Sequence, residues 1–300
     1  NDTEMQITHV IRGQEFISSM PNYLALYEAL GFDMNPSVTP ARVTASGVRQ
    51  PLPIFAHLPH IMNEQGNKKL GKRDGAKDVL DYIRDGYLPE ALDSFIATLG
   101  WNDGTEQEVF TLQELIDKFS LARVQRSGAR FDEKRLLWMN GYFIRELPLE
   151  ELYQRATSFW PAGAAQAPED YKRQVLALAQ DRLKTLKDLP DLTSYFFAEP
   201  DVNMSLITDN KQLKKLSAKQ ISDLLKTVRS DFATIDDWTA ETIQEHLNAL
   251  LERTGQKPGT LFGLIRIATT WAPFSPELNS TLALIGQAKT LGRLEKALHL

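Results

Sequence analysis

The stretch Ile7-Thr8-His9-Val10-Ile11-Arg12-Gly13-Gln14-Glu15 decides how the beginning of this chain folds. Its first five residues form a short segment that is rich in β-branched side chains, and this pattern predicts a buried strand. The polar residues Arg12 to Glu15 predict a turn at the carboxyl end of that strand. Pro53-Ile54-Phe55-Ala56 predicts a second short strand. Open α/β sheets bind ligands at the carboxyl ends of their strands, so Arg12 and Glu15 are candidates for ligand contacts.

A basic run follows the second strand, from Lys68 to Ala76 (KKLGKRDGA), with four cations within six positions. Composition alone favours a solvated basic turn, because charge clusters are usually exposed. The alternative is a glycine-containing loop that folds over a polyphosphate. Lysine suits that task as a compact point charge on a flexible stem.

From Lys77 onward the apolar spacing is helical. The helix signals include the shared face of Leu92, Phe95, Ile96 and Leu99, the capping boxes Thr111–Glu114 and Ser217–Gln220, and a helix after Asp132 that is expected to end at Gly141. Residues 161–168 are rich in Ala, Pro and Gly and predict an exposed linker. We expect domains at 1–78, 79–147 and 148–300, with a break inside the last near 203–216.

Composition excludes several classes of protein. The 300 residues carry a net charge of −5 and 42% hydrophobic residues, which is typical of an ordinary globular chain. There is no cysteine, hence no disulfide and no thiolate metal site. The histidines show no metal-binding spacing, so we predict no protein-bound metal. No apolar run is long enough for a membrane span. Because the first residue is Asn1, we expect a piece of a longer protein.

Two segments together resemble a known family. Ile7 to Glu15, followed by Phe55-Ala56-His57-Leu58-Pro59 and then Lys69 to Ala76, resembles the second half of the catalytic domain of a class I aminoacyl-tRNA synthetase of the bacterial glutamyl type. Further landmarks are Gly86 to Leu92, Trp138 to Gly141 and Lys257 to Gly259, so the resemblance covers essentially the whole chain. Gly71 stands where the family usually has serine, and Gln14 stands where it often has aspartate.

The resemblance implies a mainly α fold. It would be a C-terminal remnant of the class I α/β nucleotide-binding domain, then helical stem-contact and helical-bundle anticodon-binding domains. It also implies roles for single residues. Arg12 would bind the glutamate carboxylate, Glu15 would bind ATP, and Lys69 and Lys72 would be the catalytic signature lysines that also bind ATP. The plain alternative for Arg12 is a surface ion pair after a strand.

Near the C-terminus the resemblance implies an anticodon-binding set: Arg266, with Ser275, Pro276 and Leu278 nearby. The alternative for Arg266 is an ordinary cation on a helix surface. Two groups of cations are weaker candidates for phosphate contacts: Arg182, Lys184 and Lys187, and Lys211, Lys214, Lys215 and Lys219.

The expected activity is glutamate–tRNA ligation. The partners would be tRNA(Glu), ATP with Mg²⁺ and L-glutamate, in a cytoplasmic monomer without a membrane. The class's His-x-Gly-His signature is absent from these 300 residues, so we expect this piece to be inactive alone. Two alternatives stay open. A non-catalytic tRNA-binding module or paralogue is one. Glutaminyl-tRNA synthetase is the other, and the long helical run after Lys77 disfavours it.

Overall fold

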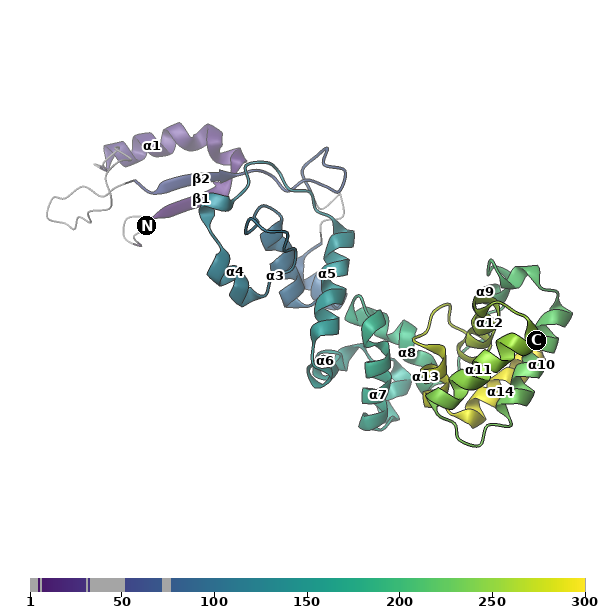
Figure 1. The fold of residues 1–300 in the computed structure, drawn as a ribbon. Helices are drawn as coiled ribbons and strands as arrows, with labels where there is room; N and C mark the ends of the chain where they lie inside the picture. The colour runs from purple at the N-terminus through teal and green to yellow at the C-terminus, as the bar shows by residue number, and fades with distance from the viewer. Residues whose placement is uncertain (1–4, 6, 31, 33–51, 72–76, 300) are drawn as a thin grey trace. The chain divides into compact units, whose positions relative to one another are not determined.

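The computed structural model describes residues 5, 7–30, 32, 52–71 and 77–299 (Figure 1). The chain divides into two compact units, residues 1–78 with 92–136, and residues 79–91 with 137–300. This division differs from the three predicted domains, whose boundaries at 78, 147 and 203–216 stay predictions.

Helices dominate the described residues, which confirms the predicted mainly α fold (Figure 1). In chain order they are α1 (Met20–Ala29), α2 (Val79–Arg84), α3 (Pro89–Thr98), α4 (Leu112–Lys118), α5 (Glu133–Glu146), α6 (Leu149–Arg155), α7 (Glu169–Ala179), α8 (Leu189–Phe197), α9 (Ser205–Thr208), α10 (Ala218–Phe232), α11 (Ala240–Thr254), α12 (Pro258–Thr270), α13 (Leu278–Ile285) and α14 (Gln287–Leu298). Both predicted capping boxes form, at the first turns of α4 and α10.

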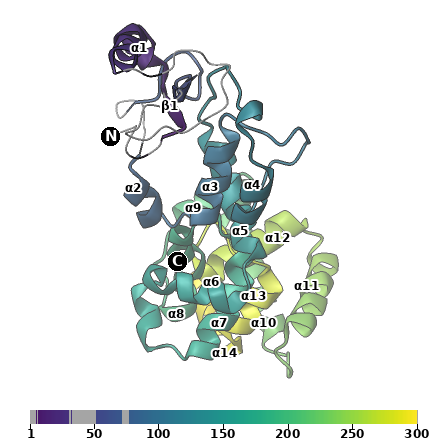
Figure 2. The ribbon, with the colours of Figure 1, turned by 90° about the vertical axis from the view of Figure 1, so that its left-hand side faces the viewer.

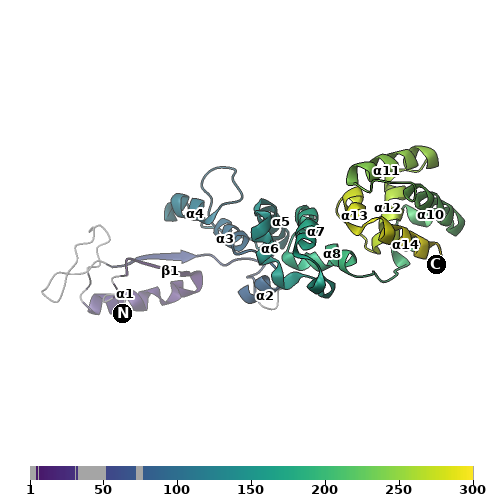
Figure 3. The ribbon, with the colours of Figure 1, turned by 90° about the horizontal axis from the view of Figure 1, so that it is seen from below.

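The strands β1 (His9–Gly13) and β2 (Ile54–Leu58) pair in parallel, with His9 opposite Ile54 and Gly13 opposite Leu58. Figure 3 shows α1 running alongside β1, and the ring of Tyr27 in α1 packs 6.0 Å from the ring of Phe55. The prediction of a buried first strand is wrong, because Ile11 is 45% exposed. Within the described residues, few side chains cover the faces of this two-stranded sheet.

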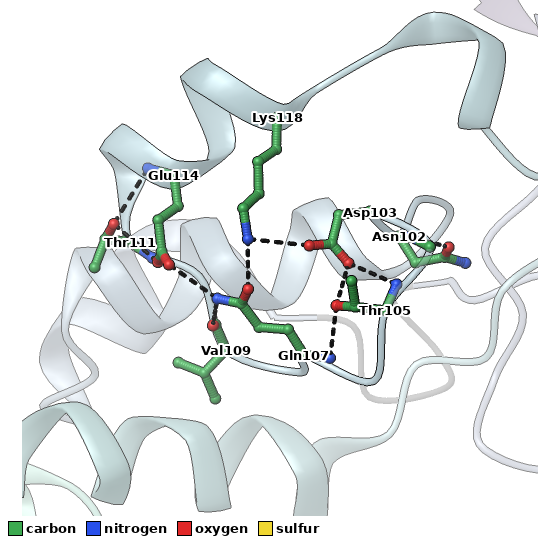
Figure 4. A network of polar contacts seen from close by, with 9 residues as sticks. Asn102, Asp103, Thr105, Gln107, Val109, Thr111, Glu114 and Lys118 are labelled. Atoms are coloured by element: carbon green, nitrogen blue, oxygen red, sulfur yellow. Dashed lines mark hydrogen bonds and ion pairs between the residues drawn. The ribbon is translucent and has the colours of Figure 1, made fainter.

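A polar network fixes the loop that leads into α4 (Figure 4). The Asp103 carboxylate accepts hydrogen bonds from Thr105 Oγ1 at 2.6 Å and from Lys118 Nζ at 3.0 Å. Lys118 also donates to Gln107 Oε1 at 2.6 Å. The hydrogen bond from Thr105 lowers the pKa of Asp103 to about 2, and the hydrogen bond and positive charge of Lys118 act in the same direction. The loop is therefore held by charge-assisted contacts to α4.

Helix α5 does not end at Gly141, as the sequence predicts, but continues to Glu146. A side chain at position 141 would lie 3.4 Å from the carbonyl oxygen of Leu183. The neighbouring Asn140 is fully buried, accepts a hydrogen bond from the Leu88 N–H at 2.7 Å and donates to the Lys184 carbonyl at 2.6 Å. Helix α5 thus contacts the 183–184 segment through Asn140, and Gly141 lies within the helix rather than at its end.

The predicted linker at 161–168 is mostly exposed, as expected, but it contains a regular turn. Residues Ala162–Gln166 form a 3₁₀ turn, and Ala164 is 1% exposed. A side chain at Gly163 would lie 3.3 Å from Phe197 Cβ in α8. Alanine and glycine allow this turn to pack closely on α8.

Helices α6 to α8, which lie together in Figure 2, and helices α10 to α14 form two groups of the second unit. Each group has its own apolar core, and the two groups share a small third one. In that third core, Tyr195 and Phe196 of α8 pack with Ala272 and Ile285. Arg293 of α14 is 3% exposed and donates to the carbonyls of Thr269 and Tyr195, each at 2.8 Å. This buried cation ties α8, α12 and α14 together.

Candidate functional site

Arg12 lies in β1, opposite His57 of β2. Its Nε donates to His57 Nε2 at 3.3 Å, and its guanidinium stands 4.7 Å from the ring centre of Tyr23 and 5.7 Å from that of Phe55. His57 therefore belongs to the second strand, which continues to Leu58, beyond the predicted Ala56. No carboxylate of the described residues is paired with Arg12. Aromatic rings orient the guanidinium while its charge stays available to an acidic ligand.

Glu15 follows β1 in a short 3₁₀ turn, Gln14–Ser19. Its carboxylate lies 3.8 Å from Lys69 Nζ and 3.7 Å from His60 Nδ1. The hydrogen bond from its own backbone N–H, followed by the charges of Lys69 and His60, lowers the pKa of Glu15. Its carboxylate folds back over Gly13, where a side chain would collide with it. Glu15 is therefore ionised and able to accept hydrogen bonds from a hydroxyl or amine.

Lys69 is placed by a compact turn around Asn63, which is 6% exposed. Asn63 Oδ1 accepts from the Asn67 N–H at 3.2 Å, and its backbone N–H donates to the Lys68 carbonyl at 2.9 Å. The Lys69 side chain itself is 59% exposed. The structure thus brings Lys69 to Glu15, although 54 residues separate them in the chain. Lys72, like Arg73 to Ala76, lies outside the described residues.

In the helical unit, Arg266 of α12 is oriented by a hydroxyl. Its Nε donates to Ser275 Oγ at 2.8 Å, and that hydroxyl donates to the Pro276 carbonyl at 2.9 Å. Burial lowers the pKa of Arg266, and the nearby charge of Arg182 acts in the same direction. Ser275 and Leu278 are 7% and 6% exposed. Arg266 thus offers the most accessible functional group of the predicted anticodon set, and the other members support its position.

A hollow of about 340 Å³ lies beside Pro276 and is lined by Ala177, Leu178, Asp181, Arg182, Pro276 and Glu277. A larger hollow of about 500 Å³ lies elsewhere, between α10 and α11, and contains no residue of the predicted sites. The smaller hollow is the relevant one, because Arg182, which follows α7, lines it together with Pro276 of the predicted anticodon set.

Sequence reasoning missed Tyr195, which is 2% exposed and whose hydroxyl has no hydrogen-bond partner among the described residues. Burial raises the pKa of this tyrosine, and the charges of Arg266 and Arg293 act against that effect. Tyr195 lies 71 residues before Arg266, and the apolar spacing of α8 marks it only as a core residue. No local pattern could have connected the two.

Within the described part of the chain, no three His, Asp or Glu side chains are grouped so that they could hold a metal ion. None of the described helices is both long enough and apolar enough to cross a bilayer.

Comparison with known proteins finds two matches along the chain. Residues 1–138 match the catalytic domain of class I tRNA synthetases (E and Q), and residues 151–298 match an anticodon binding domain. The chain therefore resembles the class I tRNA synthetases in both of these parts. Its curated relatives include the glutamate–tRNA ligases of Roseiflexus castenholzii, 34% identical, and Moorella thermoacetica, 33% identical, each over 99% of this chain.

Solved structures agree with this assignment. A glutamate tRNA ligase from Elizabethkingia meningosepticum, in complex with its amino acid, superimposes with a TM-score of 0.78 at 27% identity and covers 99% of this chain. The predicted resemblance to the glutamyl type is thus confirmed. The chain spans 58% of that structure and 56% to 57% of the two curated relatives, little more than half of their length.

Proposed function

We propose that this chain provides the ATP-closing loop and the tRNA-binding body of a glutamate–tRNA ligase. The observation that carries the proposal is the approach of Lys69 to Glu15 at the carboxyl end of β1, 3.8 Å apart, ahead of a helical body that matches an anticodon binding domain. The relatives named above are glutamate–tRNA ligases, which supports glutamate as the amino acid.

The proposed reaction begins with attack of the glutamate carboxylate on the α-phosphate of ATP, and it expels pyrophosphate. Arg12 would bind glutamate through its carboxylate, because a guanidinium makes two parallel hydrogen bonds to that group. Glu15 would accept a hydrogen bond from the ribose or adenine of ATP. Lys69 and Lys72 would neutralise the charge that builds up on the leaving phosphates. Mg²⁺ would enter with ATP, as part of that substrate.

Recognition of tRNA(Glu) would depend on Arg266. Unpaired anticodon bases present hydrogen-bonding edges and flat faces, and a guanidinium binds both. Ser275 fixes one edge of the guanidinium, which leaves its remaining donors for a base. The protein would act as a monomer in the cytoplasm.

The test measures two properties. A polypeptide of these 300 residues should bind a tRNA(Glu) transcript, and Arg266→Ala should weaken that binding. The same polypeptide should give background ATP–pyrophosphate exchange, whereas the complete protein should be active. A chain that does not bind tRNA would overturn the anticodon part. Inactivity of the complete protein would instead support a non-catalytic tRNA-binding paralogue.

A further inference from the structure

Five lysines gather on one part of the second unit, and we call them the lysine surface: Lys211, Lys214, Lys215, Lys219 and Lys257. All five are exposed, and none of their ammonium groups has a partner among the described residues. Some lysines elsewhere in the described part of the chain are paired: Lys118, Lys187 and Lys296 each approach a carboxylate within 3.0 Å. The lysine surface is therefore a local concentration of unpaired positive charge on a chain of net charge −5.

Tertiary contacts bring Lys257 to the other four. Thr260, in the first turn of α12, donates to Gln212 Oε1 at 3.3 Å. A side chain at Gly259 would lie 2.6 Å from that same oxygen, so the glycine lets the 210–215 segment approach α12 closely. Leu213 is fully buried in the core below. Figure 1 shows α9, which precedes this segment, next to α12. The lysines are thus presented by a packed, well-ordered backbone.

These lysines also stand at two helix N-termini, where a cation is electrostatically unfavourable. Lys219 is the second residue of α10, and Lys257 is the N-cap of α12. Neither helix has an acidic residue in its first turn, whereas α5, α7 and α11 each have one or more. Positive side chains beside two positive helix ends reduce the stability of the free protein, so the arrangement points to an anionic partner.

We propose that the lysine surface binds the ribose-phosphate backbone of tRNA. This inference rests on the proposed tRNA-binding function and adds a second contact area to it. Helix α12 joins the two areas, because Lys257 precedes Arg266 by nine residues, or about 13 Å along the axis. Arg266 contacts a base, which depends on sequence, and the lysines contact phosphates, which do not.

An acidic protein is the competing partner, and the surface composition disfavours it. Protein interfaces are centred on buried aromatic and arginine anchors. Between residues 203 and 260, the only large apolar side chain that is highly exposed among the described residues is Met204. Lysines without an apolar anchor suit a flexible, phosphate-rich backbone better.

The experiment measures binding of the 300-residue polypeptide to labelled tRNA(Glu) over a series of KCl concentrations. The variant is Lys214→Gln/Lys215→Gln/Lys257→Gln. Loss of three phosphate contacts should reduce the slope of log K against log salt by about 2, and should lower affinity about 10- to 100-fold. The loss should be equal for tRNAs with altered anticodon bases, whereas the loss caused by Arg266→Ala should depend on the base.

The matched control is Lys289→Gln, which removes an exposed lysine from the first turn of α14, another helix without an acidic residue there. Like Lys257→Gln, it should raise the melting temperature slightly, but it should leave tRNA binding unchanged. An unaltered salt slope in the triple variant, with wild-type binding intact, would overturn the lysine surface alone. Absence of wild-type binding would overturn the proposed function as well. Competition by polyglutamate as strong as by RNA would refute the assignment to an RNA backbone.

Discussion

The strand pair and the helical unit place their charged residues in opposite environments. Arg12, Glu15 and Lys69 lie at the edge of a thin two-stranded sheet, where Ile54 is 60% exposed. Arg293 lies inside the helical unit, 3% exposed, with carbonyl oxygens around it. The difference teaches that a charge at the sheet is free to serve a ligand, whereas a charge inside the helical unit serves the fold. Changes at the two places should therefore separate activity from stability.

The largest expected effect is on stability, from Arg293→Met. The change leaves three buried carbonyl oxygens without their donor and removes one of the two cations that contact Glu199, so it should lower the free energy of unfolding by about 3–5 kcal/mol. The matched change Arg12→Met removes contacts with aromatic rings and should cost only about 1 kcal/mol. Urea denaturation of both variants measures this. Equal losses would contradict the comparison.

Lys69→Ala should affect activity without affecting stability. A charge-assisted hydrogen bond made mainly in the transition state is worth about 1.5–3 kcal/mol, or roughly 10–100-fold in rate. ATP–pyrophosphate exchange by the complete protein should fall by that factor, while urea denaturation stays unchanged. Lys68→Ala is the neighbouring control and should cause a smaller loss. A similar loss from both variants would show that only the general positive charge of the loop matters.

Tyr195→Phe should increase the free energy of unfolding, whereas most core substitutions decrease it. It removes a buried hydroxyl without a partner among the described residues and keeps the ring that packs on Ala272 and Ile285. Because an unsatisfied buried polar group costs about 1–3 kcal/mol, the variant should be more stable by about 1 kcal/mol. Thermal and urea denaturation measure the change. A less stable variant would mean that the hydroxyl has a stabilising partner in solution.

The smallest expected effect is the pH dependence of stability that comes from Asp103 in the network of Figure 4. Asp103 has a folded-state pKa of about 2, below its ordinary value of 3.8. Its contribution to stability is therefore complete above about pH 4 and disappears as the pH falls through 2. The stability difference between wild type and Asp103→Asn should shrink over that interval. A difference that stays constant from pH 5 downward would exclude the carboxylate charge as its origin.

Local patterns predicted much of the helical fold. The two predicted capping boxes form at the first turns of α4 and α10. The failures share one cause, because burial depends on neighbours that are distant in sequence. Ile96 was expected on a buried face yet is 57% exposed. Gly141 was taken as a helix end, but α5 continues past it, and the neighbouring Asn140 donates a hydrogen bond to the remote Lys184 carbonyl.

The residues of the candidate site also fall into two kinds, those that the sequence indicates and those that only the structure reveals. Arg12 and Glu15 are close in the chain, so the strand-end pattern was sufficient to find them. The roles of all the predicted site residues, Arg12 and Glu15 included, came from the family resemblance and stay predictions. Tyr195 and the connection of Lys257 to the 211–219 lysines could be recognised only once α8, α9 and α12 were placed in space.

The order of residues alone indicated that the chain after Lys77 is mainly helical, where several helices begin, and which family the chain resembles, because capping, apolar spacing and signature residues act over a few positions. Only the tertiary structure decided which charges have partners. The ion pair of Lys69 with Glu15, the burial of Arg293 and the unpaired state of the lysine surface all depend on distances between segments that are remote in sequence. Electrostatic energy depends on distance and burial in space, and sequence separation does not determine either of them.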